Sequence, residues 1–278
     1  MTENPILHGI VLSSMPVGEY DRRLSILTKE RGRISAFARG AQRPKSALVA
    51  AAQPFVTGAF TVVEGRASYT MIRAEVNEYF TELRGDLAKT CYACYFCELA
   101  EYSTEENLDE SEALSLLYAA LRALVRGDMA LPLVRVVFEM KMTYVRGEGA
   151  RVSECVRCRA KEGPFVFHVR SGGCLCKTCA GELFDEEGRK SYELRTQMVA
   201  RGFYNLDAST WYALRFIAAT PPGKLFAFTV SDTVLSELRE VAAAWYEEYN
   251  DHRFRSAEML AEVEPVPSSG VPVGVHEQ

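Results

Sequence analysis

Four cysteines in the middle of the chain constrain its fold more than any other feature. They form two Cys-x2-Cys pairs, Cys155 with Cys158 and Cys176 with Cys179, and seventeen residues separate the pairs. Each pair suits a tight turn that directs two thiolates at one tetrahedral Zn²⁺ ion, and this spacing is typical of a zinc ribbon. The sequence therefore predicts a small module with two local turns, closed by one metal ion.

The donor set favours a structural metal site over a catalytic one. Four thiolates fill the coordination shell, whereas a catalytic zinc keeps one position open for water or substrate. The chain contains four histidines, and none lies in a His-Glu-x-x-His or paired-His pattern that would support hydrolysis. We therefore expect one structural zinc ion, no catalytic residues and no enzymatic activity.

Two further residues near the pairs could replace a ligand. Cys174 lies two residues before Cys176, and His168 lies between the pairs. We favour Cys176, because only Cys176 with Cys179 repeats the spacing of the first pair. Disulfide pairing is the alternative, but the chain starts without the basic region of a secretory signal, and no apolar stretch matches a membrane span. A cytoplasmic protein without membrane contact is expected.

The remaining cysteines lie elsewhere in the chain. Cys91, Cys94 and Cys97 recur every three residues within an apolar pattern of helical period. This pattern predicts that they pack in a core. A second metal site is less favoured, because no fourth ligand lies close to them in the sequence.

The charge distribution indicates a surface for a polyanion. The whole chain has a net charge of −5, yet the segment 22–45 holds eight basic residues and one acid, Glu30. Such a cluster predicts phosphate binding, and an ordinary solvated face is the alternative. The predicted nucleic-acid contacts are Arg22, Arg23, Arg33, Phe37, Arg39, Arg43 and Lys45.

Phe37 has two interpretations. Strand alternation over 33–39 places Ile34, Ala36 and Ala38 on one face, and Phe37 with its flanking arginines on the other. An aromatic ring framed by guanidinium groups can stack a base while its neighbours hold phosphates, as in single-strand binding on small barrels. In the other interpretation, a bulge shifts the register and Phe37 packs in the barrel core.

The order of the predicted elements indicates an α+β protein. Five strands, at 6–13, 23–28, 33–39, 54–63 and 67–76, suit a small closed barrel of the OB type. The segment 42–53 is expected to be a mobile loop across the mouth of the barrel. Helical periodicity follows at 87–102, 112–126, 131–144, 192–199, 210–218 and 233–249, with Ser111 and either Ser231 or Asp232 as N-caps and Gly127 after a C-terminus.

These elements predict three parts of the chain. An OB-fold nucleic-acid-binding domain covers 1–81, and a helical domain covers 82–264 with its zinc module at about 150–182. The tail, 265–278, is rich in Pro, Ser and Gly and is expected to be disordered. Five acids at 105–112 are expected to form a solvated face that keeps DNA on the other domain.

Several motifs in the N-terminal part occur together in one known family. They are Gly9-Ile-Val-Leu12, Gly18-Glu-Tyr-Asp-Arg22, Leu27-Thr-Lys-Glu-Arg-Gly-Arg33, Ala38-Arg-Gly-Ala41, Arg43-Pro-Lys-Ser46 and Gln53-Pro-Phe55. In this order they resemble the N-terminal domain of the bacterial RecO recombination mediators. The helical part is also similar, through Tyr95-Phe-Cys-Glu-Leu99, the two cysteine pairs with Ser171-Gly-Gly173, and 224–256. One stretch, 144–149, departs from the family pattern, where a Gly-Tyr more often leads to a Pro.

The resemblance implies a function that the residues alone do not specify. It implies a DNA repair and recombination protein that binds single- and double-stranded DNA, anneals complementary strands and is associated with the nucleoid. It also implies action with RecR and the single-strand-binding protein SSB, and indirect action on RecA through its loading. The alternatives are a zinc-ribbon nucleic-acid-binding protein of the transcription or translation machinery, and a metal-dependent enzyme that acts on nucleic acid.

Overall fold

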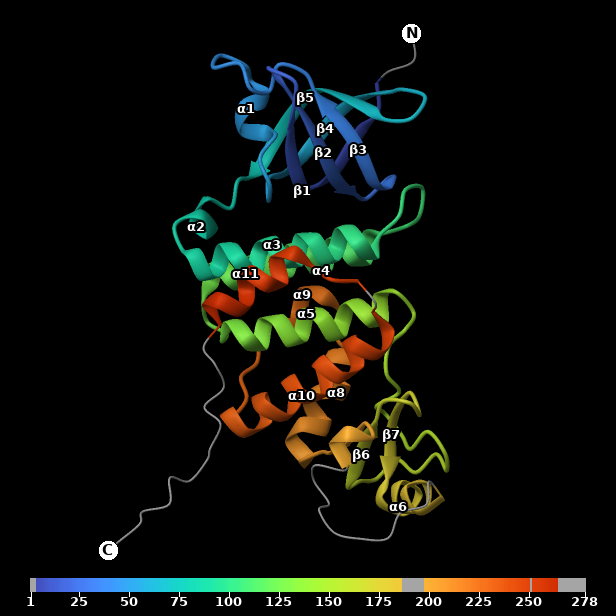
Figure 1. The fold of residues 1–278 in the computed structure, drawn as a ribbon. Coiled ribbons are helices and arrows are strands. Elements are labelled where there is room, and N and C mark those ends of the chain that lie inside the picture. Colours follow the sequence, from blue (N-terminus) through green and yellow to red (C-terminus); the bar gives the residue numbers. More distant parts are fainter. Residues whose placement is uncertain (1–3, 187–197, 251, 265–278) are drawn as a thin grey trace, which may run out of the picture.

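The molecule is elongated, with a β-barrel at one end and a small cysteine-rich sheet at the other (Figure 1). A computed structural model describes residues 4–186, 198–250 and 252–264. Helices fill the space between the two β structures, as Figure 1 shows. The predicted α+β class, with a barrel that precedes a helical part, is therefore confirmed.

Five strands close the barrel in the order β1-β2-β3-β5-β4. The strands are β1 (Ile6–Val17), β2 (Asp21–Thr28), β3 (Gly32–Ala38), β4 (Thr57–Glu64) and β5 (Tyr69–Glu78). All neighbouring strands are antiparallel except β3 and β5, which pair in parallel. Closure leaves the barrel with no open edge, as expected for an OB-type architecture.

The alternation of β3 places its residues as the sequence predicts. Ile34, Ala36 and Ala38 are fully buried in the barrel core, where they pack with Phe60 and other apolar side chains. Phe37 alternates with them, is half-buried and lies outside this core. The interpretation of Phe37 as a barrel-core residue is therefore wrong.

The segment between β3 and β4 is structured where the sequence predicts a mobile loop. It holds a short helix, α1 (Leu48–Ala51), and Ala51 and Ala52 are buried. Its earlier part forms turns, since Ser46 N donates to Arg43 O at 2.9 Å. The apolar Leu-Val-Ala-Ala run closes one end of the barrel, because burial of these side chains outweighs the freedom of a loop.

The helical part contains most of the predicted helices. The predicted ones are α3 (Leu87–Ser103), α4 (Ser111–Arg126), α5 (Leu131–Val145), α8 (Ala208–Ala219) and α10 (Asp232–Tyr249). The structure adds further helices that were not predicted, among them α2 (Thr81–Arg84), α9 (Pro222–Leu225) and α11 (Arg255–Val263). Of the predicted 192–199 helix, 192–197 lie outside the described residues, and 198–200 are helical. The expected disorder of 265–278 also concerns residues that the structure does not describe. Among the described residues, no helix is long and apolar enough to cross a bilayer.

Two of the three predicted helix caps are correct. Ser231 accepts the N–H of Val234 at the start of α10, and Gly127 adopts a φ of 67° after α4. Ser111 is not an N-cap. It is the first residue of α4, and Glu110 precedes it as the cap without a side-chain hydrogen bond. Asp109, two residues before Ser111, instead accepts the Ser111 N–H at 3.1 Å, so an Asx turn starts the helix.

The three cysteines of α3 pack as predicted. Cys91 and Cys97 are buried in the helical core, and Cys94 is half-buried against it. None belongs to a group of possible metal ligands among the described residues. The second metal site is therefore not supported by the geometry.

The barrel joins the helices through both apolar and backbone contacts. Ile10 and Leu27 point out of the barrel into the helical core. Beside them, Arg33 N donates to Glu105 O at 3.0 Å, and Asn107 N donates to Arg31 O at 2.9 Å. The acidic segment before α4 is therefore partly an interdomain contact, and the prediction of a merely solvated face is wrong there.

A glycine makes this backbone contact possible. Gly32 has a φ of 62°, and a Cβ at this position would lie 2.2 Å from Glu105 O. A larger residue would meet both the left-handed strain and the clash. The Gly32 in the β2–β3 turn thus sets how closely the helical part approaches the barrel.

The cysteine-rich end is a sheet of three short strands in the order β7-β6-β8, and a helix directly follows β7 in the chain. The strands are β6 (Phe165–His168), β7 (Gly173–Cys176) and β8 (Phe203–Asn205), and the helix is α6 (Lys177–Glu186). Aromatic contacts attach this sheet to the helices, since Phe167 packs edge-on against Trp245 with ring centroids 5.5 Å apart. The sheet therefore shares its core with the helical bundle.

Candidate metal centre and nucleic-acid interface

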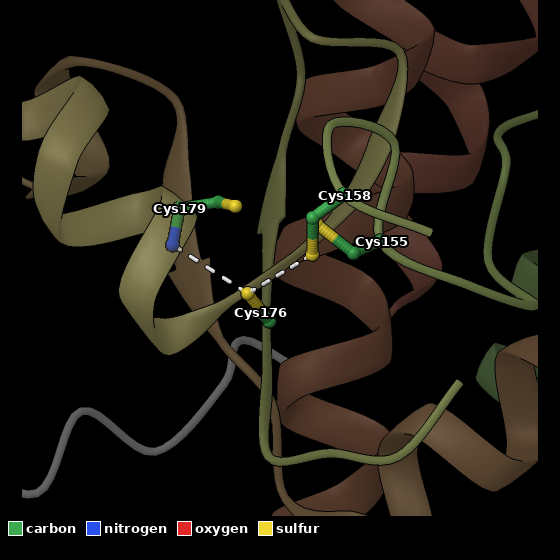
Figure 2. A group of neighbouring side chains, drawn as sticks. All are labelled: Cys155, Cys158, Cys176 and Cys179. Carbon is green, nitrogen blue, oxygen red and sulfur yellow. Dashed lines mark hydrogen bonds between the residues drawn. The ribbon is translucent and has the colours of Figure 1, made fainter. Parts of the chain in front are cut away.

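The four cysteines of the two pairs converge on one point (Figure 2). The Sγ atoms of Cys155, Cys158, Cys176 and Cys179 all lie within 4.8 Å of one another. The Sγ atoms of Cys158 and Cys176 are 3.7 Å apart. Tetrahedral zinc with Zn–S bonds of about 2.3 Å places its sulfur atoms about 3.8 Å apart. The cluster therefore has the size that one metal ion requires.

The first pair lies on a tight turn of the backbone. Cys155 N donates to Ala160 O at 2.7 Å, and Arg159 N donates back to Cys155 O at 2.9 Å. Arg159 adopts a φ of 65°, which folds the chain back after Cys158. These bonds bring both sulfurs of the pair to one side of the turn.

The second pair lies where a strand becomes a helix. Cys176 is the last residue of β7, and Cys179 lies in the first turn of α6. The N–H of Cys179 points at the Cys176 sulfur at 3.5 Å. The turn from β7 into α6 thus places the sulfur of Cys176 against the backbone of Cys179.

Close backbone packing joins the two pairs. Gly173, with a φ of 150°, pairs with Arg151, and a Cβ at Gly173 would lie 2.1 Å from Arg151 O. Val156 N then donates to Cys174 O at 2.8 Å. Gly173, which precedes the second pair, thus lets its strand approach the first turn.

The pKa values separate Cys155 from Cys174. Burial raises the pKa of Cys155, but N–H groups of Cys158, Cys176 and Arg157 outweigh it and lower this pKa to about 6. Burial raises the pKa of Cys174 to about 12. Cys174 is 0% exposed and pairs with Phe167 inside the sheet, outside the cysteine cluster. Its geometry is that of a core residue.

His168 also lies outside the cluster. Its ring stacks on Phe203 with centroids 4.0 Å apart, and its Nδ1 lies 2.7 Å from the Ser171 hydroxyl. The histidine therefore belongs to the packing of β6 on β8. The structure brings together the four cysteines chosen from the spacing, and neither alternative ligand joins them.

The second candidate site is on the outer face of the barrel. The strand register places Met15 of β1 opposite Arg23 of β2, and Arg23 opposite Phe37 of β3. Directly opposed residues share a face of the sheet, so these three side chains form one row. We call Met15, Arg23 and Phe37 the outer row. Met15 is 59% exposed, and Arg23 is exposed.

Three further predicted contacts lie at the end of the barrel next to this row. Arg39, Arg43 and Lys45 are all exposed. The Arg43 guanidinium lies 4.7 Å from the centre of the Tyr20 ring, in the β1–β2 turn. This contact brings the segment after β3 beside the β1–β2 hairpin. Aromatic and cationic groups are therefore interleaved at this end, as single-strand binding requires.

The two other predicted arginines are held by the protein itself. Arg22 lies opposite Ala38 in the inner register of the barrel, and its Nη1 donates to the Ser14 hydroxyl at 3.0 Å. Arg33 donates from Nε to Thr104 O at 2.8 Å, at the junction with the helices. The structure thus makes Arg23 and Phe37 neighbours on the outer face, leaves Arg39, Arg43 and Lys45 exposed on the segment after β3, and places Arg22 on the opposite face of β2.

Sequence reasoning missed Met15 and Tyr20. Both are exposed apolar side chains, 59% and 41% exposed, beside the predicted cations. The signal that could have found them is the β1–β2 hairpin, which pairs Met15 with Arg23 once β1 extends past residue 13. The shorter strand predicted at 6–13 excluded that pairing.

Comparisons with known proteins agree with this architecture. The family model "Recombination protein O N terminal" matches residues 4–80, and "Recombination protein O C terminal" matches residues 84–190. The first match covers the barrel strands. The second covers α3, α4, α5, α6 and both cysteine pairs, and it ends before β8 and the last helices.

Individual relatives match over most of their length. The DNA repair protein RecO of Bacillus pumilus is 30% identical over 260 residues, which cover 92% of this chain and 93% of the relative. The protein of that name from Bacillus subtilis is 30% identical over 257 residues, again 92% and 93% of the two chains. That of Alkaliphilus metalliredigens is 36% identical over 174 residues, 62% of this chain and 71% of the relative. This chain belongs to the RecO family of DNA repair proteins.

Proposed function

We propose that this protein is a recombination mediator that binds single- and double-stranded DNA through the outer face of its barrel. Membership of a DNA repair family supports the general role. The exposed region around the outer row supports the location, because it combines cations for phosphates with an aromatic ring for a base. This combination on a closed barrel is the observation that carries the proposal.

The remaining activities follow from the family resemblance. The protein anneals complementary strands and acts with RecR to help load RecA onto single strands coated by SSB. None of these activities requires a bond to be made or broken, so no enzymatic reaction is assigned. The barrel, 1–81, is the nucleic-acid-binding domain in this proposal, and 82–264 is the helical domain.

In this proposal the metal ion stabilises the helical domain. The cluster of Cys155, Cys158, Cys176 and Cys179 would hold one Zn²⁺ ion, since four thiolates suit zinc and leave no open position. The bound ion supplies a cross-link between the turn at 155–160 and the start of α6. The domain then presents a fixed surface to partner proteins.

The test is a salt titration of DNA binding by a charge-neutralised variant. The triple variant Arg39→Gln, Arg43→Gln, Lys45→Gln removes three exposed cations without a buried contact. Each neutralised charge should reduce the slope of log K against log salt by about 0.7 for single strands, so the triple variant loses about 2. The loss should be similar for unrelated sequences, which distinguishes this protein from a sequence-reading factor of transcription or translation.

A matched control keeps the same change in net charge. Lys161→Gln, Arg170→Gln, Lys224→Gln removes three exposed cations from the cysteine-rich end and α9. We expect this control to keep the slope of the unmodified protein. If the barrel variant is folded and binds with unchanged affinity and slope, the barrel face is not the DNA site.

A further inference from the structure

A groove runs between the outer face of the barrel and the helices α3 and α11. Its volume is about 620 Å³. Barrel residues from β1, β2 and β3 line one side, and residues of α3 and α11 line the other. The groove begins at the outer row, because Met15 and Arg23 belong to both.

The floor of the groove is a row of three serines. The register places Ser13 opposite Ser25, and Ser25 opposite Ser35. The Ser35 hydroxyl accepts from Arg23 Nε at 3.1 Å, and the Ser13 hydroxyl donates to Glu101 at 3.5 Å. Ser25 is only 9% exposed, and its hydroxyl has no hydrogen-bond partner among the described residues. A buried hydroxyl without a partner costs free energy, so a ligand atom that reaches it is favoured.

The walls combine donors, acceptors and apolar side chains. Arg23, Arg33 and Arg255 supply cations, while Glu101 supplies a carboxylate. The Glu98 carboxylate already has hydrogen-bond partners, since it accepts from the backbone N–H groups of Arg255 at 3.2 Å and Ser256 at 2.9 Å. Met15 and Met259, 59% and 55% exposed, give apolar surface at the rim.

We propose that this groove binds one nucleobase of single-stranded nucleic acid, with its edge against the serine row. The proposal rests on the proposed function and adds a place where one base is taken up. A base carries donors and acceptors on its edge and an apolar face, which match serine hydroxyls, a carboxylate and methionine side chains. A phosphate alone would match the arginines but would leave the carboxylate of Glu101 and the methionine side chains without a matching group.

The geometry connects this site to the outer row. Arg23 lies between Met15 and Phe37 in the outer row, and its Nε is held by Ser35 of the groove floor. A strand whose base stacks on Phe37 therefore has its next nucleotide near the mouth of the groove. Arg255 is exposed, and its guanidinium has no partner among the described residues. It would then face the phosphate backbone of the bound strand from the side of the helices.

The experiment compares oligothymidylates of about ten nucleotides that carry one abasic position, moved along the strand. At one position, loss of the base should weaken binding to the unmodified protein by about tenfold. Ser25→Ala should weaken binding to the intact oligonucleotide by about fivefold, the effect of one lost hydrogen bond. On the strand that lacks this base, Ser25→Ala should weaken binding little further, because the variant and the abasic position remove the same contact.

Two other variants complete the test. Arg255→Gln leaves the backbone contacts of Glu98 in place and should weaken binding by a similar factor on intact and abasic strands. Ser68→Ala, in the β4–β5 turn away from the groove, should bind as the unmodified protein does. Thermal melting of Ser25→Ala should show no loss of stability, because the removed hydroxyl has no partner.

Specific outcomes overturn the inference. If Ser25→Ala binds the intact strand normally, or if its abasic penalty equals that of the unmodified protein, the groove does not hold a base. Sensitivity to Arg255→Gln without any abasic effect would identify a phosphate contact instead. Failure of the proposed function is distinct, since the unmodified protein would then bind none of the oligonucleotides.

Discussion

The barrel and the cysteine-rich sheet are both small β structures, but they are stabilised in different ways. The barrel strands are 7 to 12 residues long, and their inward side chains form a core of their own. The strands of the cysteine-rich sheet have 4, 4 and 3 residues, and their buried side chains belong to the core of the helices. The barrel is closed by its own hydrogen bonds, whereas the cysteine-rich sheet is stabilised by packing against the helices.

This difference explains where a cross-link is needed. A closed barrel satisfies its strand edges and buries a continuous core, so its stability comes from many distributed contacts. Three short strands cannot bury enough surface to order the turns around them. A metal ion bound by the four cysteines would compensate, because its binding energy would become folding energy. We therefore expect the two ends of the molecule to respond independently to perturbation.

Removal of the metal should have the largest effect. Cys158→Ser replaces an exposed ligand, so it removes a metal bond with little change in packing. Since structural zinc contributes on the order of 10 kcal/mol to small modules, the segment 155–179 should lose its amide protection. Hydrogen exchange should show this loss, while protection of the barrel strands stays unchanged. Elemental analysis should return one zinc per chain for the unmodified protein and none for the variant.

Cys174→Ala is the matched control for this prediction. It removes a buried sulfur from the same sheet but outside the cluster, so a small cavity costs about 1 kcal/mol and the zinc remains. Serine is a poorer replacement at this position, because a hydroxyl at a site that is 0% exposed would lack a partner. Loss of zinc from Cys174→Ala would show that Cys174 is a ligand. A chelator that leaves melting unchanged would contradict the structural role of the metal.

A cavity in the barrel core should have the next largest effect. Phe60 is fully buried in the barrel core, and Phe60→Ala should cost about 3–5 kcal/mol of stability. The barrel should lose protection first, while the zinc content remains one per chain. Simultaneous loss of the metal would show that the two ends unfold as one cooperative unit, contrary to the comparison.

The smallest effect concerns binding rather than folding. Phe37→Ala removes a half-buried ring from the outer row, so the melting temperature should change little. If the ring stacks a base, single-strand affinity should fall by about 1–3 kcal/mol with an unchanged salt slope. Titration and melting of the same preparation separate the two effects. A variant that loses stability and keeps its affinity would assign Phe37 to packing alone.

The helices and the inner face of the barrel follow from local patterns. The predicted ranges 87–102, 112–126 and 131–144 agree with α3, α4 and α5 to within one residue at each end. Burial of Ile34, Ala36 and Ala38 agrees with a period of two residues. These features are decided by neighbours in the chain, and periodicity reports them directly.

The predictions that were wrong involve contacts between distant segments. The cap of α4 depends on Asp109 and Glu110 in a segment that also pairs with the β2–β3 turn. The segment 42–53 contains a helix because its apolar side chains pack against the core at one end of the barrel. The register also places Arg22 and Arg23 on opposite faces of β2, because adjacent residues of a strand face opposite sides, and the assignment of Arg22 to DNA stays a prediction.

The sequence by itself determined the metal ligands to be tested, the order of the β and helical parts and the position of the basic segment. Each depends on spacing or composition, which are local properties. Only the tertiary structure decided which cations share a surface, that Met15 joins Arg23 and Phe37, and that a serine row faces the helices. Strand register and domain packing create these neighbours, and residues far apart in the chain carry no local signal of their meeting.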